Sequence, residues 1–371
     1  MIKILIIGEY SGFTKNLVHG FLSLKDSPEV VVFSNQDGFK SIQQDVVNYT
    51  YAQPHNINIL GVEIKKSHHI QSFFEFRKFK KDISLYQDYF DIVFILNPEF
   101  IRNREYDFVP LFSFEDINCV RKASSRVYLS ACGIDAVFLD QLKADRDFSY
   151  PLLEIAYESP KYRALNQEVL NYVDGIIPVT GYYAEAYKNS IYHDKLLDVI
   201  PLPFDCKSVF YQDRVKHPQI SIFDGVLREY KGTMYVNKAL EIIMKQYGER
   251  VKVIRERRPY SDFIKSLSSF DIYMDQCSKH FGMSALISMS AGCLTFTGCS
   301  SYVEESLNCN SIPVVAIHDN YSDIVDKLCW WIEHPEHMML AGKKSREYVE
   351  RIHSSEIVAY NYMKVFSQNR N

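Results

Sequence analysis

The sequence lacks several features that mark particular classes of protein. Lys and Arg number 42 and Asp and Glu 46, so there is no excess of basic charge of the kind that proteins coating nucleic acid concentrate. No run approaches the roughly 20 consecutive apolar residues that span a membrane. Hydrophobic residues make up 47% of the chain and charged residues 24%, as in ordinary globular proteins. At ~150 residues per domain, the length of 371 residues predicts two domains.

The eight cysteines are scattered, and no two of them form a Cys-x-x-Cys pair. We therefore expect reduced thiols, without a metal cluster or a disulfide framework. The apolar start at residues 1–8 is too short for the core of a signal peptide and runs directly into a glycine loop. These observations predict a cytoplasmic protein.

Two regions alternate short apolar runs with longer amphipathic stretches, the pattern of parallel strands joined by helices. The first region predicts strands at 2–7, 30–33, 92–96, 126–129 and 175–179, with a less regular one at 57–62. The second predicts strands at 220–223, 251–254, 272–274, 294–297 and 313–316, then helices at 321–333 and 336–366. The pattern predicts an α/β protein in which two Rossmann-like, doubly wound parallel sheets face each other across a cleft.

Two prolines, Pro201 and Pro203, mark an extended crossing between these regions. We place the first domain at 1–203 and the second at 204–345. The segment 346–371 is expected to form a C-terminal helix that could pack back on the first domain.

Ligands of open α/β sheets bind at the carboxyl ends of the strands, so loops that follow strands are the candidate sites. The loop Gly8-Glu9-Tyr10-Ser11-Gly12 follows the first predicted strand. It has neither the spacing of a dinucleotide site nor the Lys-Ser/Thr of a P-loop. Its glycines would let the backbone approach a bound sugar, and a plain tight turn explains them equally well.

Two loops of the second region carry features suited to phosphate. Arg228 and Lys231, three residues apart in the first of these loops, could converge on a diphosphate, or they could be incidental charges at a solvated helix start. In the second loop Phe281-Gly282 precedes a helix of small residues, whose amino end would offer free N–H groups. Gly282 could equally serve only to let that helix pack closely on the sheet.

The remaining candidates are weaker. Asp145-Arg146-Asp147 has the Asp-x-Asp spacing of metal-dependent sugar transferases, but no strand precedes it, and we interpret it as a surface turn. The basic run at 255–258 is interpreted as exposed charge. Cys132 has no nearby His in the sequence to support a nucleophilic thiol. Asp135 is the one weak catalytic candidate, and we predict no metal site and no cofactor.

Taken in order, the motifs of the second region resemble those of nucleotide-sugar glycosyltransferases with the GT-B fold, particularly the family-4-like group. Arg228-x-x-Lys231-Gly232-Thr233 resembles the phosphate loop of that group, and the stretch 267–276 resembles the strand that leads to its donor site. The stretch 281–292 is similar to its glycine-containing loop and the helix that follows, and 345–356 to its closing helices. The resemblance covers about residues 195–366.

The resemblance implies a donor site in the second domain and an acceptor side in the first. In such enzymes loop cations and a helix amino end stabilise the leaving nucleoside diphosphate without a metal. The implied donor-binding residues are Gly225, Arg228, Lys231, Phe281, Gly282, Met283, Ser284 and Ser288. The implied acceptor-side residues are Gly8, Glu9, Ser11, Gly12, Cys132 and Gly133. The implied partners are a nucleotide-diphosphate sugar and a glycan or lipid-linked acceptor, as in bacterial surface polysaccharide synthesis, with peripheral contact at the inner membrane face and no nucleic acid.

The chain also departs from the family pattern. Lys279 and Ile287 stand where the family often has Glu, and Cys132 stands where it often has His. Ser288 lies beside Ile287 but about 100° further round a helix, so it replaces the ribose-binding Glu poorly. These departures leave an alternative open, in which a non-catalytic protein of the same fold binds a glycan or supports an active transferase. A sugar-nucleotide epimerase is a third, weaker possibility.

Overall fold

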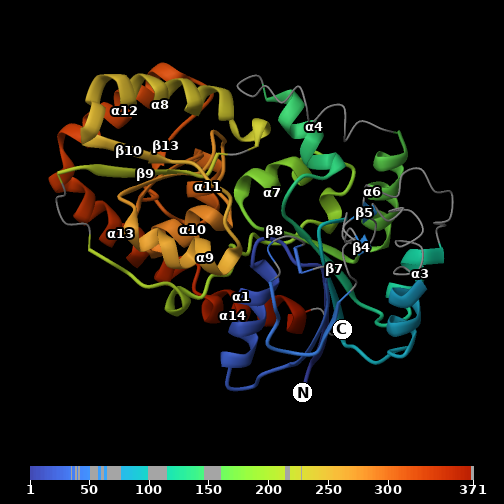
Figure 1. Cartoon of the computed structure of the whole chain (residues 1–371). Helices are drawn as coiled ribbons and strands as arrows, with labels where there is room; N and C mark the ends of the chain where they lie inside the picture. The colour runs from blue at the N-terminus through green and yellow to red at the C-terminus, as the bar shows by residue number, and fades with distance from the viewer. Residues whose placement is uncertain are drawn as a thin grey trace.

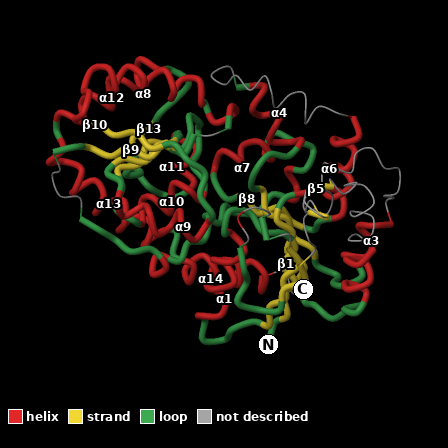
Figure 2. Tube along the Cα trace, viewed as in Figure 1, coloured by secondary structure: helices red, strands yellow, loops and turns green. Residues whose placement is uncertain are grey.

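The computed structural model describes residues 1–34, 36, 37, 40, 42–50, 57–59, 62–64, 77–98, 115–145, 160–213, 218–226 and 228–368. The chain forms two α/β lobes that lie side by side, each built on a parallel sheet flanked by helices (Figures 1 and 2). This arrangement confirms the predicted fold class. Among the described residues, no helix is both long and apolar enough to cross a membrane.

The N-terminal lobe contains a six-stranded parallel sheet. Its strand order is β3 (Asn48–Thr50), β2 (Glu29–Ser34), β1 (Lys3–Ile7), β6 (Ile92–Leu96), β7 (Val127–Ala131) and β8 (Gly175–Pro178). Among the described residues, the helices of this lobe include α1 (Phe13–Ser23), α3 (Glu115–Arg121), α4 (Ala136–Ala144), α6 (Pro160–Tyr172) and α7 (Gly181–Lys188). Every residue of β6 and β7 is buried, which is why these strands read as continuous apolar runs.

The predicted strand at 57–62 is confirmed only in part. The structure has two short strands there, β4 (Ile57–Ile59) and β5 (Val62–Ile64), which pair with each other in antiparallel fashion. They form a sheet of their own, and the edge of the main sheet is taken by β3 instead. The apolar run was a genuine strand signal, but it does not say which partner a strand pairs with.

The C-terminal lobe contains a five-stranded parallel sheet. Its order is β10 (Val251–Ile254), β9 (Ile220–Asp224), β11 (Ile272–Met274), β12 (Leu294–Thr297) and β13 (Val315–Ala316). Its helices are α8 (Thr233–Tyr247), α9 (Tyr260–Ser266), α10 (Met283–Ser290), α11 (Ser301–Ser306), α12 (Tyr321–Glu333) and α13 (Met338–Ile352), and the chain continues into α14 (Ser355–Gln368).

The predicted helix at 336–366 is interrupted at residues 353–354, between α13 and α14. The inter-lobe linker makes a bridge there: the N–H of Phe204 donates to the carbonyl of His353 (2.7 Å), and the N–H of Ser355 donates to the carbonyl of Phe204 (3.0 Å). A tertiary contact thus ends one helix and starts the next, without the Pro or Gly that would announce a break in the sequence.

Helix α14 returns to the N-terminal lobe and packs along α1 (Figure 1). Gly20 of α1 makes the close approach possible, since a Cβ there would lie 2.0 Å from the carbonyl oxygen of Ser355. Further along, the rings of Tyr362 and Phe366 pack on Phe94 of β6 at 5.0 and 5.9 Å. Because the lobes share this helix, the domain limits at 203 and 345 stay a prediction.

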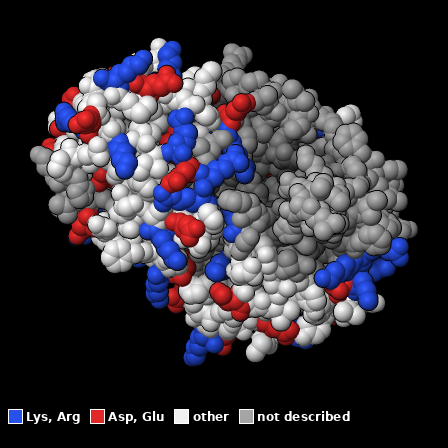
Figure 3. Space-filling model, in the orientation of Figure 1, with Lys and Arg blue, Asp and Glu red and all other residues white. Residues whose placement is uncertain are grey.

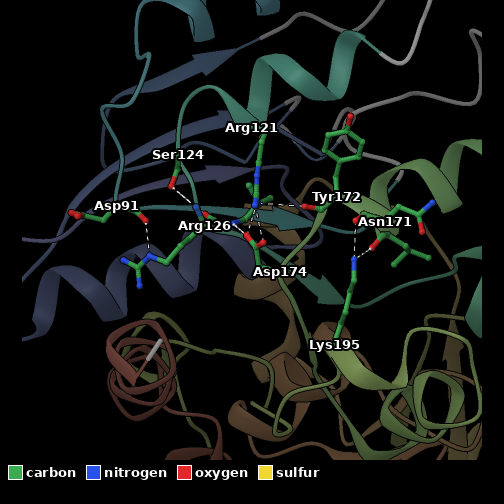
Figure 4. A network of polar contacts seen from close by, with 10 residues as sticks. Asp91, Arg121, Ser124, Arg126, Asn171, Tyr172, Asp174 and Lys195 are labelled. Carbon is green, nitrogen blue, oxygen red and sulfur yellow. Dashed lines mark hydrogen bonds and ion pairs between the residues drawn. The ribbon is translucent and has the colours of Figure 1, made fainter. Parts of the chain in front are cut away.

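A network of polar contacts ties together the amino-terminal ends of β6, β7 and β8 (Figure 4). Asp174 accepts the backbone N–H of Val127 (2.7 Å) and pairs with the guanidinium of Arg121, whose Nη2 lies 2.8 Å away. Lys195 donates to the carbonyls of residues 170 and 171 at 2.8 Å each. Ligands of such sheets bind at the opposite, carboxyl ends, so we assign this network to stability.

We expect Gly20→Ala to lower the free energy of unfolding by about 2 kcal/mol, because the added methyl collides with the backbone of α14. At an unobstructed helix position the same change would stabilise by about 1 kcal/mol, so the sign is diagnostic. Urea unfolding measures it, with Leu22→Ala on the exposed side of α1 as the control. A more stable Gly20→Ala variant would contradict the α1–α14 contact.

Candidate functional site

The loop after β9 is shaped by two close approaches. A Cβ on Gly225 would lie 2.4 Å from the Tyr273 hydroxyl, and one on Gly232 would lie 2.6 Å from the Cβ of Cys277. Gly232 also has a φ of +82°, which favours glycine. The loop therefore lies against the loop that follows β11. The Thr233 hydroxyl donates to the carbonyl of Arg228 (2.7 Å), which fixes the turn.

Lys231 and Ser284, predicted separately, meet at one carboxylate. Asp275 is fully buried at the end of β11, and its Oδ1 accepts the Ser284 hydroxyl at 2.5 Å and lies 3.4 Å from Lys231 Nζ. Its Oδ2 accepts the Thr297 hydroxyl at 2.8 Å. Sequence reasoning gave Asp275 no role, although an acidic residue directly after a buried strand was an available signal. Arg228 lies at the start of the same turn with an exposed side chain.

The amino end of α10 follows directly. Gly282 is its N-cap in an extended conformation, and no side chain caps this end among the described residues. Phe281 and Met283 are both buried, and the ring of Phe281 packs 5.8 Å from that of His353. These two side chains therefore hold the helix in place, and the backbone N–H groups of its first turn are what it can offer an anion.

Ser288 does not join this group. It is fully buried, and its hydroxyl donates to the carbonyl of Ala285 (2.9 Å) and lies 2.7 Å from the Thr295 hydroxyl of β12. Its side chain is thus engaged with the helix itself and with the sheet. Ile287, which stands where the family often has Glu, is also buried.

The loop after β1 is filled from within. Glu9 is fully buried, and its carboxylate accepts the backbone N–H groups of Gly12 (2.8 Å) and Lys15 (3.0 Å) and the side-chain amide of Gln44 (2.7 Å). It therefore occupies the anion position at the amino end of α1. Burial raises the pKa of Glu9 to about 7, against the lowering effect of these donors.

Tyr260 of the second lobe and Asp37 of the first lobe also contact this loop. A Cβ on Gly12 would lie 2.7 Å from the hydroxyl of Tyr260, so the C-terminal lobe contacts the loop at that point. Ser11 has a φ of +55° and donates its N–H to Asp37 at 2.7 Å. Gly8 has a φ of +110°. The predicted acceptor-side residues of this loop are therefore held by contacts within the protein.

The loop after β7 offers no evident nucleophile or base. Burial raises the pKa of Cys132 to about 12, so its sulfur stays a thiol. Asp135 is fully buried, accepts the N–H of Phe138 (2.8 Å) as the N-cap of α4, and accepts the Tyr187 hydroxyl (2.8 Å). This weak catalytic candidate thus serves to hold its own lobe together.

One earlier interpretation needs correction. Asp145 is not in a surface turn: its side chain is 8% exposed, lies 2.7 Å from Lys279 and accepts the Tyr182 hydroxyl at 2.8 Å. Arg146 and Asp147 lie outside the described residues. Arg255 is exposed, as expected for the basic run at 255–258, and its Nε also donates to the fully buried Asp224 at 2.6 Å. In both cases the partner comes from a distant segment, so local sequence did not indicate the ion pair.

One face of the molecule carries a cluster of basic side chains. Lys and Arg side chains gather on the part of the C-terminal lobe that adjoins the N-terminal lobe, with acidic side chains among them (Figure 3). Within the part of the chain that the structure describes, no group of three or more His, Cys, Asp or Glu side chains gathers in a way that could hold a metal ion. The arrangement is suited to an anion that approaches between the lobes.

Comparison with known proteins gives the fold. No family model matches the chain, and no curated protein matches its sequence. Among solved structures, it is similar to sucrose-phosphate synthase from Thermosynechococcus elongatus, with a TM-score of 0.64 and 12% identity over 99% of each chain. HepE from Anabaena, in complex with UDP and glucose, gives 0.62 and 11% over 99% of this chain and 100% of HepE. The chain has the GT-B fold.

An epimerase shares this architecture. The UDP-GlcNAc 2-epimerase of Neisseria meningitidis, bound to UDP-GlcNAc, has a TM-score of 0.56 and 11% identity over all of both chains. The resemblance to GT-B glycosyltransferases is thus confirmed at the level of the fold. Membership of the family-4-like group stays a prediction.

We expect Glu9→Gln to gain stability relative to the natural chain as the pH rises. A carboxyl whose pKa rises from 4.5 to about 7 on folding stabilises most at low pH, and that contribution is lost as the pH climbs through this window. Between pH 5 and pH 8 the difference in unfolding free energy should shift by about 2 kcal/mol in favour of the amide. Urea unfolding at both pH values measures this, with exposed Glu241→Gln as the control, and a shift below about 0.5 kcal/mol would refute it.

Proposed function

We propose that this protein is a metal-independent glycosyltransferase that moves a sugar from a nucleotide-diphosphate sugar to a glycan or lipid-linked acceptor. The observation that carries the proposal is the meeting of Lys231 and Ser284 on Asp275. It brings the phosphate loop and the uncapped amino end of α10 to the carboxyl edge of the same sheet. Ligands of such sheets bind at that edge.

The electrostatics of this edge favour a leaving diphosphate. Arg228 offers an exposed guanidinium fork, Lys231 a point charge and α10 its first-turn N–H groups. Asp275 orients Lys231 and Ser284 before any ligand arrives, so little reorganisation accompanies binding. Its own negative charge offsets part of the attraction that Lys231 exerts on an anion. Fixed positive charge of this kind stabilises the charge that develops as the sugar leaves.

The comparisons supply the donor to test first. HepE was solved with UDP and glucose, and the N. meningitidis epimerase with UDP-GlcNAc. Both share this fold, which supports a uridine nucleotide sugar as the starting candidate. The acceptor is expected to enter from the side of the N-terminal lobe. The loops at 8–12 and 132–135 follow β1 and β7 there. Contact of the two lobes would exclude water from the transfer.

A non-catalytic donor-binding protein is the second candidate. Cys132 is held as a thiol, Asp135 caps its own helix, and Ile287 is buried where the family often has a carboxylate. These observations favour binding without chemistry. Donor affinity combined with the absence of transfer to any of a panel of glycan and lipid-linked acceptors would support this candidate over an active transferase.

We expect Arg228→Ala combined with Lys231→Ala to weaken UDP binding by at least a hundredfold, because each charge-assisted contact contributes about 1.5–3 kcal/mol. Calorimetry with UDP, GDP and CMP measures it. Lys245→Ala combined with Lys265→Ala, at two exposed lysines of α8 and α9, should bind like the natural chain and controls for the loss of two positive charges. Unchanged affinity in the double variant would show that the phosphate assignment is wrong.

Transfer or hydrolysis of the donor should survive EDTA, since the proposed site stabilises the diphosphate with side chains and a helix end alone. The assay is sugar release measured with and without chelator, followed by added Mg²⁺ or Mn²⁺. Loss of activity in EDTA with recovery on addition of either ion would overturn metal independence and return attention to Asp145 and Asp147.

A further inference from the structure

The donor loop, residues 275–282, contacts the opposite lobe through His280. The imidazole lies against three aromatic rings of the N-terminal lobe: Tyr183 at 5.2 Å, Phe138 at 5.6 Å and Tyr182 at 5.7 Å between centroids. Burial lowers the pKa of His280 to about 4. An ionisable ring thus fills the seam between the lobes, next to the Phe281-Gly282 pair that starts α10.

The hydrogen bonds around His280 accommodate a neutral imidazole. The backbone N–H of Gly133 donates to the Tyr183 hydroxyl oxygen at 3.0 Å, and the Tyr183 hydroxyl can donate to His280 Nε2, 3.3 Å away. With Nε2 as the acceptor, the ring proton is on Nδ1 and points to the Ser278 hydroxyl at 3.0 Å. We assign this tautomer because burial lowers the pKa of His280 and favours the neutral ring.

A second contact runs beside the first. Lys279, the preceding residue of the loop, pairs with Asp145 at the end of α4, and the Tyr182 hydroxyl donates to the same carboxylate. Two consecutive residues of the donor loop therefore contact the N-terminal lobe: Lys279 pairs with Asp145, and His280 lies against Tyr182 and Tyr183. The position of α10 relative to the acceptor side depends on these contacts.

The charged and titratable groups around the ring come from both lobes. From its own lobe, Asp275 favours a charged imidazole and Lys231 opposes it. The N-terminal lobe presents the hydroxyls of Tyr182 and Tyr183, with Cys132 and Asp135 facing Tyr183 from behind. The Lys279–Asp145 pair is adjacent and internally balanced. Enclosure by neutral rings is the largest influence, and it opposes charge.

We propose that Tyr183 and His280 form a latch between the lobes that holds while the imidazole is neutral and opens when it takes up a proton. In separated lobes the ring meets water and regains its ordinary pKa of 6.5. Closing therefore expels a proton below that pH, and acid favours the open form. From the two pKa values, the closing equilibrium weakens roughly thirtyfold between pH 8 and pH 5. This latch does not depend on the proposed sugar transfer.

Small-angle scattering of the full chain at pH 8 and pH 5 tests the latch. The radius of gyration of the natural protein should rise at pH 5. His280→Gln keeps an acceptor for Tyr183 but cannot be charged, so its radius should not change with pH. Tyr183→Phe keeps the ring and removes the hydroxyl, so its lobes should separate at a higher pH than those of the natural chain. Tyr187→Phe, on the same helix but bonded to Asp135 within its own lobe, should behave like the natural chain.

Imidazole titration by NMR provides a second readout that a merely structural contact would not move. His280 should titrate far below 6.5 in the natural protein and move toward 6.5 in Tyr183→Phe. If His280→Gln does not fold, as judged by circular dichroism, the scattering and the imidazole titration of Tyr183→Phe together test the proposal. A natural protein with the same radius at both pH values, or a His280→Gln variant with the same acid expansion, would overturn the proposal.

Discussion

The candidate site depends on one buried carboxylate. Asp275 has no exposure, and a lone charge in that position would be very costly. It is satisfied by a lysine from the phosphate loop, a hydroxyl from α10 and a hydroxyl from β12. Losing any one of these partners would leave the buried charge under-compensated. The charge therefore fixes the positions of the loop after β9, α10 and β12 relative to one another. The same contacts that satisfy Asp275 also place Lys231 near the amino end of α10, where an anion could bind.

The amino ends of four helices near the candidate loops are occupied differently. In the N-terminal lobe, Glu9 fills the amino end of α1 and Asp135 caps that of α4. In the C-terminal lobe, Asn320 caps α12, whereas the amino end of α10 has no side-chain cap among the described residues. Since helix amino ends attract anions, an anion is favoured at α10 over the other three ends.

The architecture was largely predictable because local hydrophobic patterns in the sequence determine most of its strands and helices. Runs such as Ile4–Ile7 and Ile92–Leu96 mark strands buried on both faces, and the helix at 321–333 matches α12 at both ends. The order of motifs also indicated the right fold. What could not be predicted came from distant contacts. The break at 353–354 is made by the linker, and the depth of Asp145 is set by Lys279. No periodicity within a segment carries that information.

The site was predicted in part for the same reason. The spacing of Arg228 and Lys231 is local and was visible, whereas Asp275 gains its role only when three elements meet. Ser288 shows the limit of carrying a motif across: it stands one residue after the matching position, and its hydroxyl lies 2.7 Å from that of Thr295. A helical wheel gives the angle of a side chain around its axis, but not which side of the helix faces the sheet.

The packing of α14 on α1 has a consequence for how the molecule is made. More than 300 residues separate Gly20 from its contact at Ser355, so a ribosome must synthesise the whole C-terminal lobe before α1 can be covered. Until then the apolar face formed by Phe94 and Tyr128, which Phe366 later covers, is open to water and to other nascent chains. A messenger cut short before codon 355 would yield a first lobe that is complete in its sheet and still prone to aggregate.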